Sequence, residues 1–180
     1  ATRDYVFELD TPGGAPLLSI YGGKITTYRR LAEEALERLA PYLRSAKAKE
    51  GWTGKAPLPG GDMDVSAVAA LSAELTRNYP FITSAHAARL AHAYGTRATK
   101  LLGSAKSFAD LGQSFGATLT ESEVRYLIAN EWAYSAEDIV WRRSKLGLRL
   151  SADEIASLDE WIKAHRVSGE RPLREVGGRP

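Results

Sequence analysis

The spacing of hydrophobic and polar positions along the chain changes after residues 22–23. Over residues 4–10 apolar and polar side chains alternate, which is typical of a β-strand. A turn sequence at 11–14 separates this run from a second strand-like run at 16–21. Two strands do not form a stable sheet by themselves. We therefore expect either a ribbon packed on the helix that follows or sheet partners that lie outside this sequence.

Beyond the glycine pair the apolar positions recur every three or four residues, and this spacing predicts a helix of about five turns. The apolar positions that define this helix are Ile25, Tyr28, Leu31, Ala32, Ala35, Leu36, Leu39 and Leu43.

The stretch 47–63 has no hydrophobic period and is rich in glycine and proline, so we expect an extended connector and a domain boundary there.

After the connector the whole pattern is helical. One helix is expected from Val65 to the Tyr79-Pro80 pair, because proline disfavours helical backbone in the residue before it. The next should begin at Thr83 or Ser84 and end at Gly95. Three further starts are indicated by a hydroxyl residue followed three positions later by an acid. These pairs are Thr120 with Glu123, Ser135 with Asp138, and Ser151 with Glu154.

The predicted fold is therefore mainly α. A bundle-like helical domain should cover residues 64–166, preceded by a short two-stranded β segment and one helix in residues 1–46. The tail at 167–180 contains three glycines, two prolines and few apolar side chains, so we expect it to be flexible.

Composition narrows the class of protein without naming a ligand. Of 180 residues, 44% are hydrophobic and 26% charged, as in an ordinary globular domain. The net charge of +2 argues against nucleic acid as a main partner, and the lack of cysteine excludes disulfides and thiolate chemistry. No apolar run is long enough to span a membrane. Because the chain begins at Ala1 without methionine, we expect it to be part of a longer protein.

The segment from Gly22 to Thr27 is the strongest candidate for chemistry. It lies between a predicted strand and the first helix, where glycine lets backbone approach a ligand and the helix start presents free N–H groups. Lys24 adds a positive charge, and Thr26 or Thr27 can cap the helix or donate to a ligand oxygen. A plain strand-to-helix turn with a surface lysine remains the alternative from spacing alone.

Other motifs favour structural roles. Ser114 lies in a G-x-S-x-G sequence followed by Asp138 and His165, the chain order of an α/β-hydrolase triad. That motif needs a buried strand before the serine and a helix after it, and neither is indicated here, so we expect a loop. His86 and His92 fall on different faces of one helix, with His165 remote, so no metal site is expected.

Glu131 lies on the apolar side of its helix, so we expect a structural ion pair with Arg142 or Arg143 on the next helix. The three tryptophans of the late helices are expected to anchor a core or an interface. They are Trp132, Trp141 and Trp161.

Several ordered segments carry a resemblance to a known family. Residues 2–5 and 15–29 resemble the closing strands and last helix of the flavin domain in aerobic FAD-dependent glycerol-3-phosphate dehydrogenases. The resemblance covers residues 1 to about 165. It continues into the family's helical C-terminal domain at 58–61, 79–81, 93–95, 110–112, 131–133 and 141–146.

The resemblance implies a flavoprotein that oxidises sn-glycerol 3-phosphate to dihydroxyacetone phosphate. In this family the hydride from C2 of the substrate goes to flavin N5, and the electrons pass to a membrane quinone. It implies that Arg3 and Lys24 bind the substrate, that Thr27 assists, and that the protein is peripheral on the cytoplasmic side of the inner membrane. The implied cofactor contacts are Gly23, Lys24, Ile25 and Thr26.

The family's N-terminal G-x-G-x-x-G segment, which holds the rest of FAD, has no counterpart here. We therefore expect these 180 residues alone to be soluble, to bind no FAD tightly and to have no activity. For residues 40–165 the expected roles are packing, oligomer contacts, or docking to a partner or membrane surface. The alternative for the whole chain is a non-catalytic helical interaction or docking module.

Overall fold

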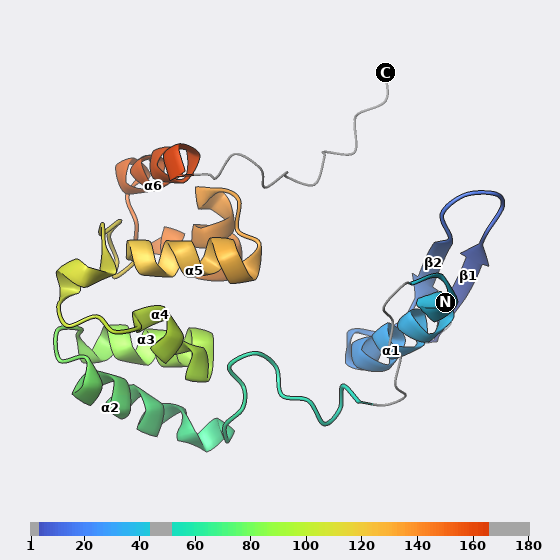
Figure 1. The fold of residues 1–180 in the computed structure, drawn as a ribbon, viewed down its shortest axis with the longest axis horizontal. Coiled ribbons are helices and arrows are strands. Elements are labelled where there is room, and N and C mark those ends of the chain that lie inside the picture. The colour runs from blue at the N-terminus through green and yellow to red at the C-terminus, as the bar shows by residue number, and fades with distance from the viewer. Residues whose placement is uncertain (1–3, 44–51, 166–180) are drawn as a thin grey trace. The chain divides into compact units, whose positions relative to one another are not determined.

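The computed structural model describes residues 4–43 and 52–165, which belong to two compact units, Ala1–Leu58 and Pro59–Pro180 (Figure 1). These residues are mainly helical with one two-stranded antiparallel sheet, so the predicted fold class is confirmed. The predicted tail, residues 167–180, and part of the predicted connector lie outside the described residues.

The first unit is a β-ribbon followed by a helix. Strands β1 (Tyr5–Asp10) and β2 (Leu17–Gly22) pair in antiparallel register, with Tyr5 opposite Gly22. The predicted five-turn helix is present, with α1 (Tyr28–Leu39) between two short 3₁₀ turns, η1 (Ile25–Thr27) and η2 (Ala40–Tyr42).

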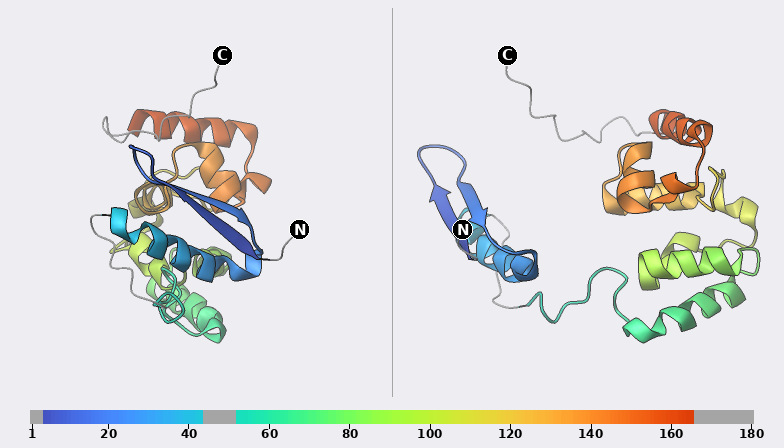
Figure 2. Two further views of the ribbon diagram at one scale, coloured as in Figure 1. Left: turned by 90° about the vertical axis from the view of Figure 1, so that its right-hand side faces the viewer. Right: turned by 180° about the vertical axis from the view of Figure 1, so that it is seen from behind.

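The described residues of this unit form no buried core. None of them is buried, although α1 lies along the ribbon (Figure 2). The Arg38 guanidinium stacks over the Phe7 ring at 4.9 Å. A ribbon and one helix expose much apolar surface that a larger sheet would cover. The exposed large apolar side chains are Val6, Leu9, Leu17, Ile20, Tyr21, Ile25, Tyr28, Leu36, Tyr42, Leu43, Trp52 and Leu58.

The second unit is a helical domain with a continuous core. Its described elements are η3 (Val65–Ala67), α2 (Val68–Asn78), α3 (Ser84–Tyr94), η4 (Gly95–Arg97), α4 (Ala98–Leu102), η5 (Phe108–Leu111), α5 (Glu121–Glu131), η6 (Asp138–Arg143), η7 (Leu146–Leu148) and α6 (Ala152–His165). The largest fully buried apolar side chains come from most of them: Leu75, Leu90, Leu111, Leu119, Leu127, Ile139, Leu158 and Ile162.

Two predicted helix starts are confirmed by their caps. The hydroxyl of Thr83 accepts from the amide of His86 at 3.1 Å, at the start of α3. Ser151 and Glu154 form a reciprocal capping box at the start of α6, with N···O distances of 2.8 and 3.2 Å. Local sequence therefore fixes where α3 and α6 begin.

Helical segments also begin after Thr120 and Ser135 as predicted, but each differs from the expectation in one respect. Thr120 precedes α5 as expected, but its side chain makes no capping hydrogen bond. The carboxylate of Glu123 binds Arg89 instead of an amide at the helix start, so the predicted capping box is wrong. Ser135 and Asp138 do form a box, with distances of 3.1 and 3.2 Å. The residues that follow form a π-helix instead of an α-helix. Its last turn closes when the amide of Ser144 donates to the main-chain carbonyl of Ile139, five residues earlier, at 2.9 Å.

Candidate functional site

The glycine pair at the end of β2 turns the chain sharply into α1. Gly22 and Gly23 have φ angles of +76° and +93°, in the left-handed region that side chains disfavour. A β-carbon on Gly22 would also lie 2.9 Å from the carbonyl oxygen of Asp4. The main chain at the start of the helix is therefore tightly turned and has no side chains at these two positions.

The residues after the pair form an exposed loop. Lys24 has extended backbone, and Ile25 is 88% exposed although it is apolar. The hydroxyl of Thr27 donates to the carbonyl oxygen of Lys24 at 2.9 Å, so this side chain closes the turn and does not cap α1. All of residues 23–26 are exposed on this loop, whereas Arg3 lies outside the described residues.

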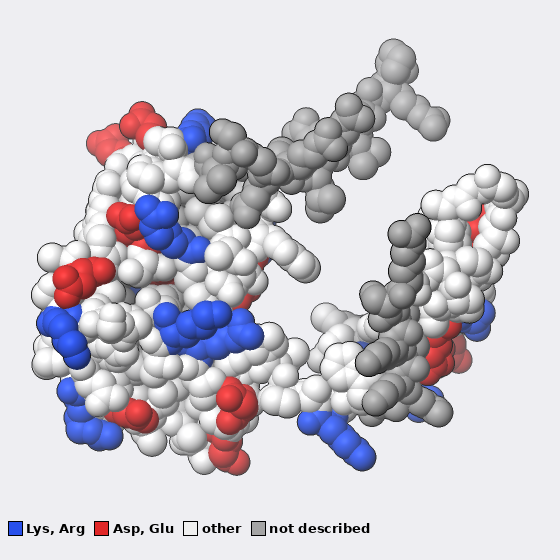
Figure 3. Space-filling model, viewed as in Figure 1, with Lys and Arg blue, Asp and Glu red and all other residues white. Residues whose placement is uncertain are grey.

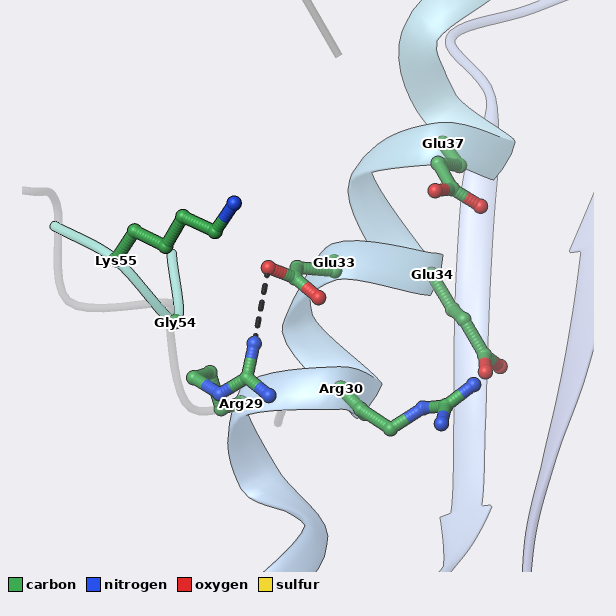
Figure 4. A pocket seen from close by; sticks show the side chains of 7 residues that line it. All are labelled: Arg29, Arg30, Glu33, Glu34, Glu37, Gly54 and Lys55. Carbon is green, nitrogen blue, oxygen red and sulfur yellow. Dashed lines mark hydrogen bonds and ion pairs between the residues drawn. The ribbon is translucent and has the colours of Figure 1, made fainter. Parts of the chain in front are cut away.

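A hollow of about 510 Å³ lies beside α1 in the same unit (Figure 4). Three basic and three acidic side chains line it, and Arg29 pairs with Glu33 at 3.1 Å. Because the charges balance, the hollow offers no net attraction to an anion or a cation. The lining residues are Arg29, Arg30, Glu33, Glu34, Glu37, Gly54 and Lys55.

Thr53 fastens the connector to α1 beside this hollow. Its amide donates to the Glu33 carboxylate at 3.2 Å, its hydroxyl bonds the same oxygen, and Arg29 donates to that hydroxyl at 3.2 Å. The hydrogen bond from the Thr53 hydroxyl, supported by the charge of Arg29, lowers the pKa of Glu33. This part of the predicted connector is therefore bound to the first unit.

The predicted ion pair between Glu131 and Arg142 or Arg143 does not form. Arg142 instead pairs with Glu137 at 2.8 Å and Asp138 at 3.0 Å. Arg143 donates through Nε to the main-chain carbonyl of Glu131 at 2.9 Å. Because α5 ends at Glu131, its last carbonyl groups have no partners within the helix and accept from this arginine.

The buried carboxylate of the helical unit belongs to Glu123. Its side chain is 0% exposed and accepts two hydrogen bonds from the Arg89 guanidinium, both at 2.6 Å. The hydroxyl of Tyr94 donates to the same carboxylate at 2.6 Å. The cluster therefore joins α3 to α5 through a bidentate ion pair in which the carboxylate is fully buried and the arginine side chain is 16% exposed.

Arg89 also holds the loop before α5. Its Nε donates to the hydroxyl of Thr118 at 3.0 Å and Nη2 donates to the Thr118 carbonyl at 3.1 Å. Burial opposes the charge of Arg89, but the hydrogen bonds and charge of Glu123 outweigh it, so the pKa of Arg89 is raised. Glu123 lies three and four residues before Tyr126 and Leu127, a sequence signal for an inward-facing acid that the capping pattern concealed.

His86, one turn before Arg89, makes the stability of this unit depend on pH. Burial, with a smaller effect of Arg89, lowers its pKa to about 4 from 6.5. The unfolded chain therefore binds a proton at this histidine more readily than the folded chain does. The contribution of His86 to the free energy of unfolding is fully present above pH 6.5 and falls by roughly 3 kcal/mol as the pH drops to about 4. We expect this decline in urea unfolding of the chain between pH 7.5 and 4.5. It should flatten in His86→Gln, and an equally steep decline in that variant would contradict the assignment.

The G-x-S-x-G segment is a loop and not a nucleophile elbow. Ser114 forms an isolated antiparallel bridge with Thr120, while Asp138 caps its own helical segment. His165 stacks on Trp161 with ring centroids 4.1 Å apart. The three residues of the supposed triad are thus engaged separately. Within residues 4–43 and 52–165, no three His, Asp or Glu side chains are grouped to hold a metal ion.

The late tryptophans differ in exposure. Trp161 is a core residue at 8%, Trp141 is 39% exposed and Trp132 is 77% exposed. On the face drawn in Figure 3, basic and acidic side chains are interspersed, in keeping with the small net charge. The helices of the described segments are all too short or too polar to cross a bilayer.

Comparison with known proteins identifies the relatives of this chain. It is 44% identical over 166 residues to aerobic glycerol-3-phosphate dehydrogenase of Escherichia coli, a match that covers 89% of this chain and 32% of that protein. Glycerol-3-phosphate dehydrogenase of Pseudomonas aeruginosa is 46% identical, covering 91% and 31%. D-erythritol 1-phosphate dehydrogenase of Brucella abortus is 42% identical, covering 89% and 32%.

The chain thus spans about one third of the length of these relatives. A model of the C-terminal domain of alpha-glycerophosphate oxidase matches residues 52–164. This range contains every described helix of the second unit, apart from the last residue of α6, His165. The chain therefore belongs to the family of the C-terminal domain of alpha-glycerophosphate oxidase.

Proposed function

We propose that this chain is the C-terminal part of an FAD-dependent enzyme that oxidises sn-glycerol 3-phosphate to dihydroxyacetone phosphate. In this proposal Lys24 and Arg3 bind the substrate, Thr27 supports the turn, and the helical unit has no catalytic residue. Residues 1–46 would be the edge of a flavin domain that these 180 residues do not complete, so the chain alone is inactive.

The observation that carries the proposal is the register of the ribbon. Tyr5 pairs with Gly22, so the chain enters β1 and leaves β2 at the same end, beside the exposed loop. Lys24 follows the end of β2 by two positions and so lies at this end of the ribbon, and Arg3 stands two positions before Tyr5 in the sequence. A lysine and an arginine together suit a phosphate ester, and arginine can bind it with two hydrogen bonds.

The loop also fits the flavin end of FAD. Gly22 and Gly23 hold a tight left-handed turn and are exposed, so the main chain before Lys24 is accessible to a flat ring system. Ile25 offers an apolar surface that is almost fully exposed in the first unit. FAD, when bound, would accept the hydride equivalent from C2 of the substrate. The first amides of η1, which continues into α1, would stabilise negative charge there.

The test is Lys24→Ala in the full-length protein. Removing a charged hydrogen bond to substrate costs about 1.5 to 3 kcal/mol, so kcat/KM for glycerol 3-phosphate should fall roughly 10- to 150-fold. Steady-state kinetics measure this change, and flavin absorbance checks that FAD is still bound.

The matched control is Lys55→Ala, because Lys55 is an exposed lysine of the same unit that lines the charge-balanced hollow beside α1. Its kinetics should equal those of the unmodified enzyme. Unchanged kinetics in Lys24→Ala with glycerol 3-phosphate would refute the proposed site and favour the non-catalytic docking module. Comparison with D-erythritol 1-phosphate would show which of the two substrates named for the relatives this protein uses.

We further propose quinone as the electron acceptor, reached by a peripheral contact with the cytoplasmic side of the inner membrane. Support comes from the aerobic dehydrogenase of Escherichia coli among the relatives. Exposed apolar side chains on the ribbon and α1 supply surface for contact with the rest of the protein, a second copy or a membrane.

A further inference from the structure

Two buried side-chain atoms of the helical unit have no hydrogen-bond partner among the described residues. They are Nε2 of His86 and Oγ1 of Thr120. The two residues are 2% and 0% exposed, so bulk water does not reach them. Buried polar atoms in proteins are nearly always paired, with protein groups or with ordered water.

Three contacts relate α3 to α5. Arg89 of α3 binds Glu123 of α5. Tyr94, further along α3, donates to Glu123 and also meets Tyr126, further along α5, with ring centroids 5.4 Å apart. We infer from this order that the two helices run in the same direction and that the turns before Arg89 and before Glu123 lie side by side.

His86 and Thr120 occupy those earlier positions. His86 lies three residues before Arg89, and Thr120 lies three residues before Glu123. On this inference their two free atoms face a common gap between the helices. Neither atom bonds the other directly, since both lack a partner.

The first turn of α5 adds donors to this gap. The amide of Glu121 donates to a loop carbonyl at 2.8 Å, and Val124 closes the first turn on the Thr120 carbonyl at 3.0 Å. The contacts of the described residues give no partner to the amides of Ser122 and Glu123. At an ordinary helix start the hydroxyl of the capping residue would accept from one of them.

We propose that one buried water molecule joins these groups, accepting from the Glu123 amide and hydrogen-bonding to Thr120 Oγ1 and His86 Nε2. A buried water typically makes about three such bonds. It can donate or accept, so it suits either tautomer of the histidine.

The surrounding charge favours water over an anion. The Glu123 carboxylate lies one turn along α5 from the gap and would repel a negative ligand. Arg89 cannot offset that repulsion, because its guanidinium is already bound to Glu123 and Thr118. The site therefore suits a neutral ligand that can both donate and accept hydrogen bonds.

The experiment compares Thr120→Val, which keeps the shape and loses the hydroxyl, with Thr120→Ser, which keeps the hydroxyl. In the 180-residue chain, water-selective NMR should give a long-lived water cross-peak at the Glu123 amide. We expect the cross-peak to persist in Thr120→Ser and to disappear in Thr120→Val, with Tm lowered by about 2 to 4 °C in the latter. The control, Thr76→Val, removes a hydroxyl that bonds within its own helix and should leave the cross-peak intact.

A crystal structure of the unmodified chain grown in bromide provides the second readout. One water peak within hydrogen-bond distance of both His86 Nε2 and Thr120 Oγ1 supports the proposal. A direct bond between those atoms, an anomalous bromide peak in the gap, or the absence of a slow water cross-peak would each overturn it.

Discussion

Replacing Arg89 by alanine should destabilise the helical unit by about 3 to 5 kcal/mol, a large part of the roughly 5 to 15 kcal/mol that stabilises a typical domain. The change leaves the fully buried carboxylate of Glu123 with only the hydroxyl of Tyr94 as a partner. It also frees both groups of Thr118 that the guanidinium holds. Urea unfolding followed by far-UV circular dichroism measures the loss.

A double replacement separates the ion pair from packing. Arg89→Met combined with Glu123→Leu removes both charges and keeps apolar volume, so its cost should be smaller than that of Arg89→Ala. Lys163→Ala is the control for an ordinary surface pair, because Lys163 is 72% exposed where it meets Asp159. If Arg89→Ala were as mild as Lys163→Ala, the buried pair would have no structural importance.

Gly95→Ala should be comparably severe, for a steric reason. Gly95 has φ of +54°, and a β-carbon there would overlap the carbonyl oxygen of Gly60 and lie 2.8 Å from its carbonyl carbon. The amide of Thr96 donates to that same carbonyl at 3.1 Å, so relieving the overlap breaks a main-chain hydrogen bond. We expect a loss of about 3 kcal/mol or more, measured as a lower urea midpoint.

Gly103→Ala is a closely matched control. Gly103 ends α4 with φ and ψ of 56° and −133°, nearly the same as the 54° and −136° of Gly95. A β-carbon on Gly103 would meet nothing within 4 Å. This variant therefore measures backbone strain alone, about 1 to 3 kcal/mol, and the difference between the two isolates the contact with Gly60. Equal losses would show that the close approach of the two glycines has no energetic effect.

Helix limits were predictable where the signal is local. Thr83 and Ser151 start helices because their hydroxyls accept from amides three residues ahead, and the sequence shows both partners together. Tyr79 ends α2 just before Pro80, as the backbone preference before proline requires. The exposed Gly23-Lys24 loop was equally visible, because a change of period marks it.

The rest depends on contacts that local sequence does not reveal. Thr120 and Glu123 have the spacing of a capping box, but Arg89, 34 positions away, attracts the carboxylate more strongly than two amides would. The approach of Gly60 to Gly95 is likewise non-local. The π-helix at Asp138–Arg143 closes its hydrogen bonds over five residues where an α-helix uses four, a difference that a short apolar pattern does not resolve.

The lack of any buried residue among the described parts of the first unit bears on how the protein exchanges its amide protons. Protection against exchange comes from burial and cooperative packing, which the helical unit has and the ribbon with α1 lacks. Amides of β1 and β2 would open at little cost in free energy, while those around Leu90 and Leu127 would open only when the core unfolds. The same polypeptide would thus have fast-exchanging amides in the ribbon and slow-exchanging amides in the helical core. Slower exchange of the ribbon amides would show that a partner has bound over the ribbon.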